Sequence, residues 1–237
     1  MKHPGEKLPL LAFTLGDVAG IGPEIVVRAW QDLCALCRPV VAGDGPTLER
    51  ALTLLSRPGL RLRQIAATHD AAGNPHLVDY CQVVHADLRT IAPGRIDPTA
   101  GLAAHDFLVW AIDQAMARKI DGIVTAPLNK ESLRAAGIHH PGHTEILAER
   151  TGTGQFAMVL AIEGLAVIHQ TLHMALRDVF HHLDPDSIAA KGVLLEKLLK
   201  DLGVTNPRLG LAALNPHAGE HGLFGYEEKR ILRPLVE

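Results

Sequence analysis

The sequence is poor in cysteine, has no excess of basic residues and contains no long apolar run. Three cysteines among 237 residues cannot form a disulfide framework, and an odd number without an export signal favours reduced thiols. Lys and Arg number 23 against 26 Asp and Glu, so we expect no nucleic-acid partner. No apolar run approaches the roughly 18 residues of a membrane span, and the polar N-terminus is unlike a secretory signal. These absences predict a cytoplasmic protein with no membrane partner.

The composition is otherwise that of a globular protein with a sizeable core. Hydrophobic residues make up 47% of the chain and charged residues 21%, which is enough for one large domain or two small ones. Histidine is abundant, at 14 residues. This abundance directs attention to metal or proton chemistry.

Apolar strand-like segments alternate with helical ones along the chain. Strands are predicted at residues 9–15, 39–42, 82–86, 122–126 and 208–214, and helices at 46–55, 99–119, 187–202, from 23 and from 226. Residues 155–163 and 165–170 fit either a hairpin or two strands of one sheet. This alternation predicts an α/β fold with a largely parallel sheet. We place a first α/β domain at about 1–127 and a second at about 128–237.

Polar residues cluster where the predicted strands end, which is where ligands bind in open α/β sheets. The clusters are Gly16-Asp-Val-Ala-Gly-Ile-Gly-Pro-Glu24, Thr125-Ala-Pro-Leu-Asn-Lys130, Gly142-His-Thr-Glu145, Thr171-Leu-His173 and Asn215-Pro-His-Ala-Gly-Glu220. The first cluster lacks the Gly-Lys-Ser/Thr of a P-loop and the third glycine of a Rossmann motif, because Ile25 stands there. It fits either a tight strand-to-helix turn or a helix N-terminus that receives an anion.

His143, His173 and His217 lie in three separate loops, and histidines from such loops often share a divalent metal. Taken singly, each is more often a capping or hydrogen-bonded loop residue than a ligand. Lys130 fits a carboxylate or phosphate contact as well as a plain helix start. Cys34 and Cys37 are better explained by packing than by redox chemistry or zinc binding.

Taken in order, the five clusters resemble the 4-hydroxythreonine-4-phosphate dehydrogenase family, and the resemblance spans nearly the whole chain. It implies two α/β domains around a cleft, as in isocitrate and isopropylmalate dehydrogenases, with an NAD site that is not a Rossmann site. The implied reaction is NAD-dependent, with NADP as an alternative, and converts 4-phosphooxy-L-threonine to a 3-keto acid. That acid loses carbon dioxide to give 3-amino-2-oxopropyl phosphate, in pyridoxine 5'-phosphate biosynthesis.

The resemblance also implies roles for individual residues. His173 and His217 would bind a divalent metal, which is zinc, magnesium or cobalt, while His143 and Thr144 would contact the phosphorylated hydroxy acid. The family's metal site is shared between two subunits, so a homodimer is expected. The family pattern continues beyond Glu237 to a third metal histidine, so the chain resembles a fragment or a shortened member with an exposed apolar surface.

Other functions compatible with the same residues remain. Related enzymes act on four-carbon sugar-acid phosphates or on aromatic dihydrodiols. A metal-dependent hydrolase or aldolase could use the same histidines, and a truncated binding module could retain the fold without catalysis.

Overall fold

The computed structural model describes residues 8–236, which divide into two compact units, one up to Gly152 and one from Thr153. The first unit contains β1 (Leu10–Thr14), α1 (Gly22–Leu36), β2 (Arg38–Gly43), α2 (Gly45–Leu54), β3 (Arg61–Gln64), β4 (Leu77–Gln82), α3 (Pro98–Met116), β5 (Gly122–Thr125), α4 (Lys130–Ala135) and α5 (His143–Thr151). Its five strands form one sheet in the order β3-β4-β2-β1-β5, and every neighbouring pair is parallel. The predicted α/β fold with a parallel sheet is confirmed.

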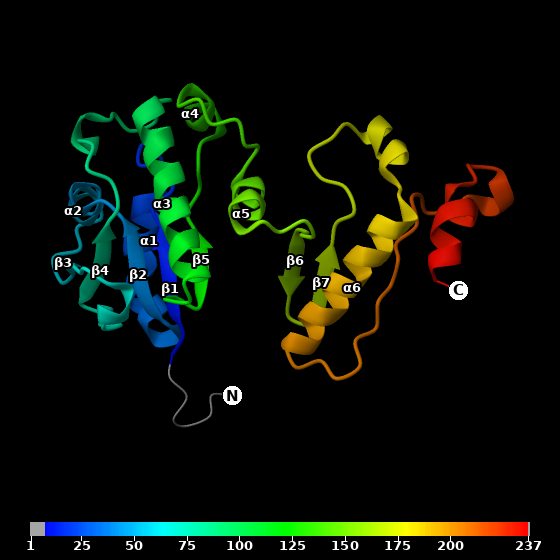
Figure 1. Cartoon of the computed structure of the whole chain (residues 1–237), viewed down its shortest axis with the longest axis horizontal. Coiled ribbons are helices and arrows are strands. Elements are labelled where there is room, and N and C mark those ends of the chain that lie inside the picture. Colours follow the sequence, from blue (N-terminus) through cyan, green and yellow to red (C-terminus); the bar gives the residue numbers. More distant parts are fainter. Residues whose placement is uncertain (1–7, 237) are drawn as a thin grey trace. The chain divides into compact units, whose positions relative to one another are not determined.

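Alternating residues of β1 pack into two different clusters of the core. Leu10 and Ala12 pack with Ala111 of α3, whereas Phe13 belongs to the cluster that contains Trp30 of α1. Successive side chains of a strand point to opposite faces, so the sheet is covered by helices on both sides. Figure 1 shows α3 lying across one of these faces.

Helix α3 begins with a strong cap and confirms the helix predicted at 99–119. The Asp97 carboxylate accepts hydrogen bonds from the backbone N–H of Thr99 at 2.7 Å and of Ala100 at 3.1 Å, and Pro98 occupies the first turn. A Cβ on Gly101 would lie 2.1 Å from the Ser132 carbonyl oxygen, so this glycine lets α4 approach α3 closely. Helices α4 and α5 therefore pack with the first unit. The boundary between the two units lies after Gly152, later than the domain boundary predicted at about residue 127.

The second unit is built from a hairpin and one long helix. Strands β6 (Val159–Ile162) and β7 (Leu165–Ile168) pair antiparallel, which selects the hairpin of the two arrangements predicted for this segment, and α6 covers Pro185–Asp201. Leu195 and Leu232 are its buried hydrophobic residues within the described chain. Ile162 is 73% exposed and Leu176 80%.

Two sequence predictions of local structure are wrong. The strand predicted at 82–86 lies earlier, as β4, and the predicted strand at 208–214 is irregular chain with Leu209 and Leu211 exposed. A strand needs a hydrogen-bonded neighbour, and residues 208–214 have none in the described part of the second unit. The helix predicted from residue 226 is confirmed as a continuous helical segment, with π-helical geometry at Glu228–Leu232 and 3-10 geometry at Arg233–Leu235. Among residues 8–236, no helix has the length and apolar character needed to span a membrane.

Candidate functional site

The sheet of the first unit reverses its strand order beside β1. The chain moves from β1 to β2 and outward to the far edge, then returns to place β5 on the other side of β1. In open α/β sheets, ligands bind beyond the carboxyl ends of the strands at such a switch point. The loops that follow β1 and β5 are therefore the first place to look for a site.

The glycine loop after β1 lies against the backbone that follows β5. The Asp17 N–H donates to the Pro127 carbonyl at 2.9 Å. Gly16 has φ +63°, and a Cβ there would lie 2.2 Å from the same carbonyl oxygen. A Cβ on Gly22 would lie 2.1 Å from the Leu15 carbonyl oxygen. Only glycine permits these close approaches. The loop is therefore a tight strand-to-helix turn, which is one of the two structures predicted for it.

Buried polar groups hold the glycine loop to the start of α4. Asp17 is 4% exposed, and its Oδ1 accepts the Ala19 N–H at 2.8 Å while Ser132 Oγ donates to its Oδ2 at 3.4 Å. Asn129 caps α4 by accepting the N–H groups of Glu131 and Ser132. These contacts give Asp17 and Asn129 structural roles. Lys130 is exposed at the first position of α4.

His143 is the first residue of α5 and is hydrogen-bonded to the backbone of Ala126, directly after β5. Burial lowers the pKa of its imidazole below the usual value, and the bond to Ala126 opposes part of that shift. The ring is thus neutral near pH 7, with one nitrogen that donates and one that can accept. Thr144 follows in the first turn and is half-buried. Three of the five sequence clusters therefore come together at the switch point of the first unit.

Glu24 is a feature of this region whose environment the sequence did not predict. Its Oε2 atom is buried and has no hydrogen-bond partner within the described residues. A buried carboxylate oxygen without a partner is costly, and a bound molecule that donates a hydrogen bond would remove that cost. The acidic residue that follows Gly22-Pro23 is the available sequence signal, but by itself it indicates no more than a favourable charge at a helix N-terminus.

The two histidines expected to bind metal both lie in loops of the second unit. His173 follows β7, is exposed and has φ +51°. His217 is also exposed, its N–H donates to Asn215 Oδ1 at 2.9 Å, and its ring centroid lies 5.1 Å from that of Phe224. Glu220 lies nearby, with its Oε2 3.7 Å from His217 Nδ1.

The donor chemistry of these histidines suits a divalent metal, because imidazole nitrogens are common ligands of zinc and similar ions. No group of three His, Cys, Asp or Glu side chains positioned for a metal occurs among residues 8–236. Non-glycine residues after His217 adopt left-handed backbone conformations, with φ +48° at Ala218, +39° at Glu220 and +58° at His221. Such backbone strain is concentrated at functional sites in proteins.

The cysteines behave as packing residues, as predicted. All three are free thiols, and Cys37 and Cys81 are buried. Burial raises the pKa of Cys34 and of Cys81 to about 11, with smaller contributions from neighbouring acidic groups. Neither thiol is therefore a ready nucleophile or metal ligand near pH 7.

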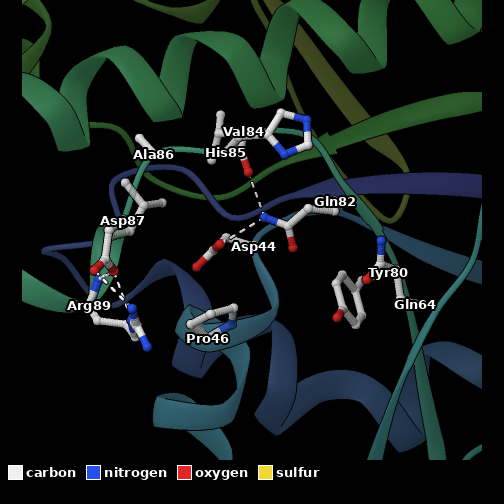
Figure 2. A pocket seen from close by; sticks show the side chains of 11 residues that line it. Asp44, Pro46, Gln64, Tyr80, Gln82, Val84, His85, Ala86, Asp87 and Arg89 are labelled. Carbon is white, nitrogen blue, oxygen red and sulfur yellow. Dashed lines mark hydrogen bonds and ion pairs between the residues drawn. The ribbon is translucent and has the colours of Figure 1, made fainter.

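A pocket of about 380 Å³ lies beside β4, at the carboxyl ends of β2 and β4. Figure 2 shows the Gln82 amide between Asp44 and Val84, and its Nε2 donates to Asp44 Oδ1 at 2.8 Å and to the Val84 carbonyl at 2.6 Å. Asp44 also caps α2 through Thr47, and Arg89 is paired with Asp87. These groups satisfy one another, so the pocket is a weaker candidate than the switch point.

The fold and the gathering of motif loops at its switch point define an α/β protein of the open-sheet, ligand-binding class. Residues 35–237 match the family of the pyridoxal phosphate biosynthetic protein PdxA, and the chain belongs to that family. The resemblance inferred from the five clusters is confirmed.

Named relatives indicate an oxidoreductase. The chain is 39% identical over 229 residues to the D-threonate 4-phosphate dehydrogenase of Pectobacterium atrosepticum, covering 96% of this chain and 70% of that protein. It is 40% identical over 232 residues to the 4-hydroxythreonine-4-phosphate dehydrogenase of Beijerinckia indica, covering 95% of this chain and 66% of that protein. The prediction of a dehydrogenase of this family is confirmed.

Solved structures agree in fold. The 4-hydroxythreonine-4-phosphate dehydrogenase from Klebsiella pneumoniae superposes with a TM-score of 0.88 at 39% identity, covering 96% of this chain and 70% of that one. A terephthalate 1,2-cis-dihydrodiol dehydrogenase from Burkholderia xenovorans is similar at a TM-score of 0.62 and 27% identity, covering 96% and 69%.

Proposed function

We propose that the chain oxidises the secondary alcohol of 4-phosphooxy-L-threonine, using NAD or NADP, to a 3-keto acid that then loses carbon dioxide. The observation that carries this proposal is the meeting of three family motifs at the switch point of the sheet, where His143 lies against Ala126. The names of the relatives support the reaction class. The product, 3-amino-2-oxopropyl phosphate, is the one expected in pyridoxine 5'-phosphate biosynthesis.

A second substrate, D-threonate 4-phosphate, is favoured by relatives of that name at 39% and 40% identity. The two compounds share the C4 phosphate, the carboxylate and the C3 hydroxyl that would be oxidised. They differ at C2, where one carries an ammonium group and the other a hydroxyl. A comparison of kcat/KM for the two compounds therefore decides between the substrates without affecting the proposed reaction type.

His143 and Thr144 are proposed to bind the substrate. The neutral His143 ring is held by Ala126 through one hydrogen bond, which leaves its second nitrogen able to accept a hydrogen bond from a substrate hydroxyl. Thr144 can donate to a carboxylate or phosphate oxygen near the N-terminus of α5, where negative charge is favoured. Replacement of His143 by Ala should alter kcat or KM, and an unchanged pair of constants would contradict the assignment.

His173 and His217 are proposed to hold zinc, magnesium or cobalt. A divalent ion bound to a substrate alcohol lowers the pKa of that hydroxyl and polarises the carbonyl formed from it. Because two histidines leave the coordination incomplete, we propose a homodimer in which the second subunit contributes to the site. His173→Ala and His217→Ala should each abolish metal-dependent turnover while the circular dichroism spectrum stays unchanged.

The test is the appearance of NADH absorbance when the chain is mixed with NAD, a divalent metal and each phosphorylated acid in turn. NADH formation that EDTA abolishes supports the proposal. Cleavage of the substrate without NADH would indicate a metal-dependent hydrolase or aldolase instead. Binding of the acid without turnover would indicate a non-catalytic module.

A further inference from the structure

The segment that joins β7 to His173 is held by two residues of α6. Lys191 Nζ donates a hydrogen bond to the Gln170 carbonyl oxygen, and Gln170 Nε2 donates to Ser187 Oγ at 3.2 Å. The Gln170 amide also reaches the His182 carbonyl at 3.4 Å. Ser187 and Lys191 are four residues apart in α6, so they lie on the same face of the helix. Both the backbone and the side chain of Gln170 are thus tied to neighbouring structure.

The contact of Lys191 is partly shielded from water. Burial lowers the pKa of its ammonium group. The Gln170 Oε1 atom is itself buried, without a hydrogen-bond partner in the described residues. The ammonium group of a lysine normally stays in water. Because Lys191 has lost part of that hydration, its hydrogen bond to the Gln170 carbonyl is costly to break, and this holds the carbonyl in a defined place.

The position of Gln170 affects His173 because only Thr171 and Leu172 lie between them. His173 adopts a left-handed backbone conformation with φ +51°, which is uncommon for a non-glycine residue. Gln170 is the point closest in sequence to His173 at which the structure shows this chain anchored to α6.

We propose that Lys191 is a positioning residue that, through the Gln170 carbonyl, holds the His173 loop in the conformation that presents the imidazole to a divalent metal. This inference rests on the proposed role of His173 as a metal ligand. Residues that orient metal ligands typically change metal affinity by about 10- to 100-fold when they are replaced. The same range is expected here.

The experiment measures Co²⁺ affinity by calorimetry on the full chain, with thermal unfolding recorded in parallel. Lys191→Met keeps the apolar stem and removes the donor, and we expect it to weaken Co²⁺ binding roughly tenfold or more. Lys191→Arg retains an N–H donor and should restore affinity to near the wild-type value. Lys197→Met is the matched control, because Lys197 is exposed on the same helix, and it should bind Co²⁺ as the wild type does.

His173→Ala separates the two hypotheses. If His173→Ala loses Co²⁺ binding while Lys191→Met keeps wild-type affinity, the positioning role is wrong and the proposed metal site stands. If His173→Ala binds Co²⁺ as the wild type does, both are wrong. A lower unfolding temperature for Lys191→Met with unchanged affinity would show a purely structural role and would also overturn the inference.

A second variant covers the case in which Lys191→Met does not fold. Ser187→Ala removes the contact to the Gln170 amide from the same helix face, and it should weaken Co²⁺ binding by a smaller factor than Lys191→Met. Unchanged affinity in Ser187→Ala would then refute the anchoring of this loop by α6.

Discussion

Replacement of Gly16 by Ala tests whether the glycine loop is held against the chain after β5. A Cβ at this position would lie 2.2 Å from the Pro127 carbonyl oxygen and 2.8 Å from that of Ala126. Because ordinary contacts are much longer, the loop or the carbonyl would have to move by about 1 Å. This movement would break the hydrogen bond from the Asp17 N–H to Pro127.

Three costs contribute to the expected loss of stability. A left-handed conformation costs a residue with a Cβ about 1–2 kcal/mol. Overpacking costs about 1–3 kcal/mol, and the lost backbone hydrogen bond costs about 1 kcal/mol. Together they predict a decrease of about 3–6 kcal/mol in the free energy of unfolding. That decrease is a large part of the roughly 5–15 kcal/mol typical of a domain.

Gly152→Ala is the matched control, because Gly152 has φ +66° but a Cβ there would have no neighbour within 4 Å. Its free energy of unfolding should decrease only by the conformational cost of about 1–2 kcal/mol. Both tryptophans, Trp30 and Trp110, lie in the first unit, so their fluorescence during urea unfolding reports on that unit alone. Equal destabilisation by Gly16→Ala and Gly152→Ala would refute the close approach on which the site depends.

Three further predictions follow from burial and charge. Burial lowers the pKa of His143 in the folded chain, so on acidification the imidazole is protonated in the unfolded chain at a higher pH than in the folded chain. The free energy of unfolding should therefore have its full value above the unfolded pKa of 6.5 and should decrease as the pH falls from there through the lower folded pKa. His143→Gln should flatten this part of the curve of unfolding free energy against pH, and identical acid slopes would contradict the burial of the ring. Cys34 and Cys81, whose pKa values are raised to about 11, should react with a thiol reagent near neutral pH only after denaturation, and rapid labelling of the native chain would be the contrary result. Limited proteolysis should leave a resistant fragment that ends near Gly152, because the second unit buries few apolar residues, whereas degradation that starts within the first unit would argue against this difference.

Local pattern was sufficient for much of the fold. The apolar spacing of residues 99–119 predicts α3, and Asp97 and Pro98 then define its start. The apolar runs that became β1 and β2 are strong signals because central parallel strands are buried on both faces. Edge strand β3 escaped prediction because its sequence is polar, and Arg63 is held by an ion pair to the buried Asp79 at 2.6 Å.

The motifs determined the family and the candidate residues, since five clusters in a fixed order carry far more information than any one of them. Their meeting in space required the tertiary structure. The contact of His143 with Ala126, the approach of Gly16 to Pro127 and the bond from Lys191 to Gln170 join residues far apart in the chain. Periodicity reports only which face of an element is apolar, whereas these contacts depend on strand order, on left-handed backbone geometry and on which helix packs beside which strand end.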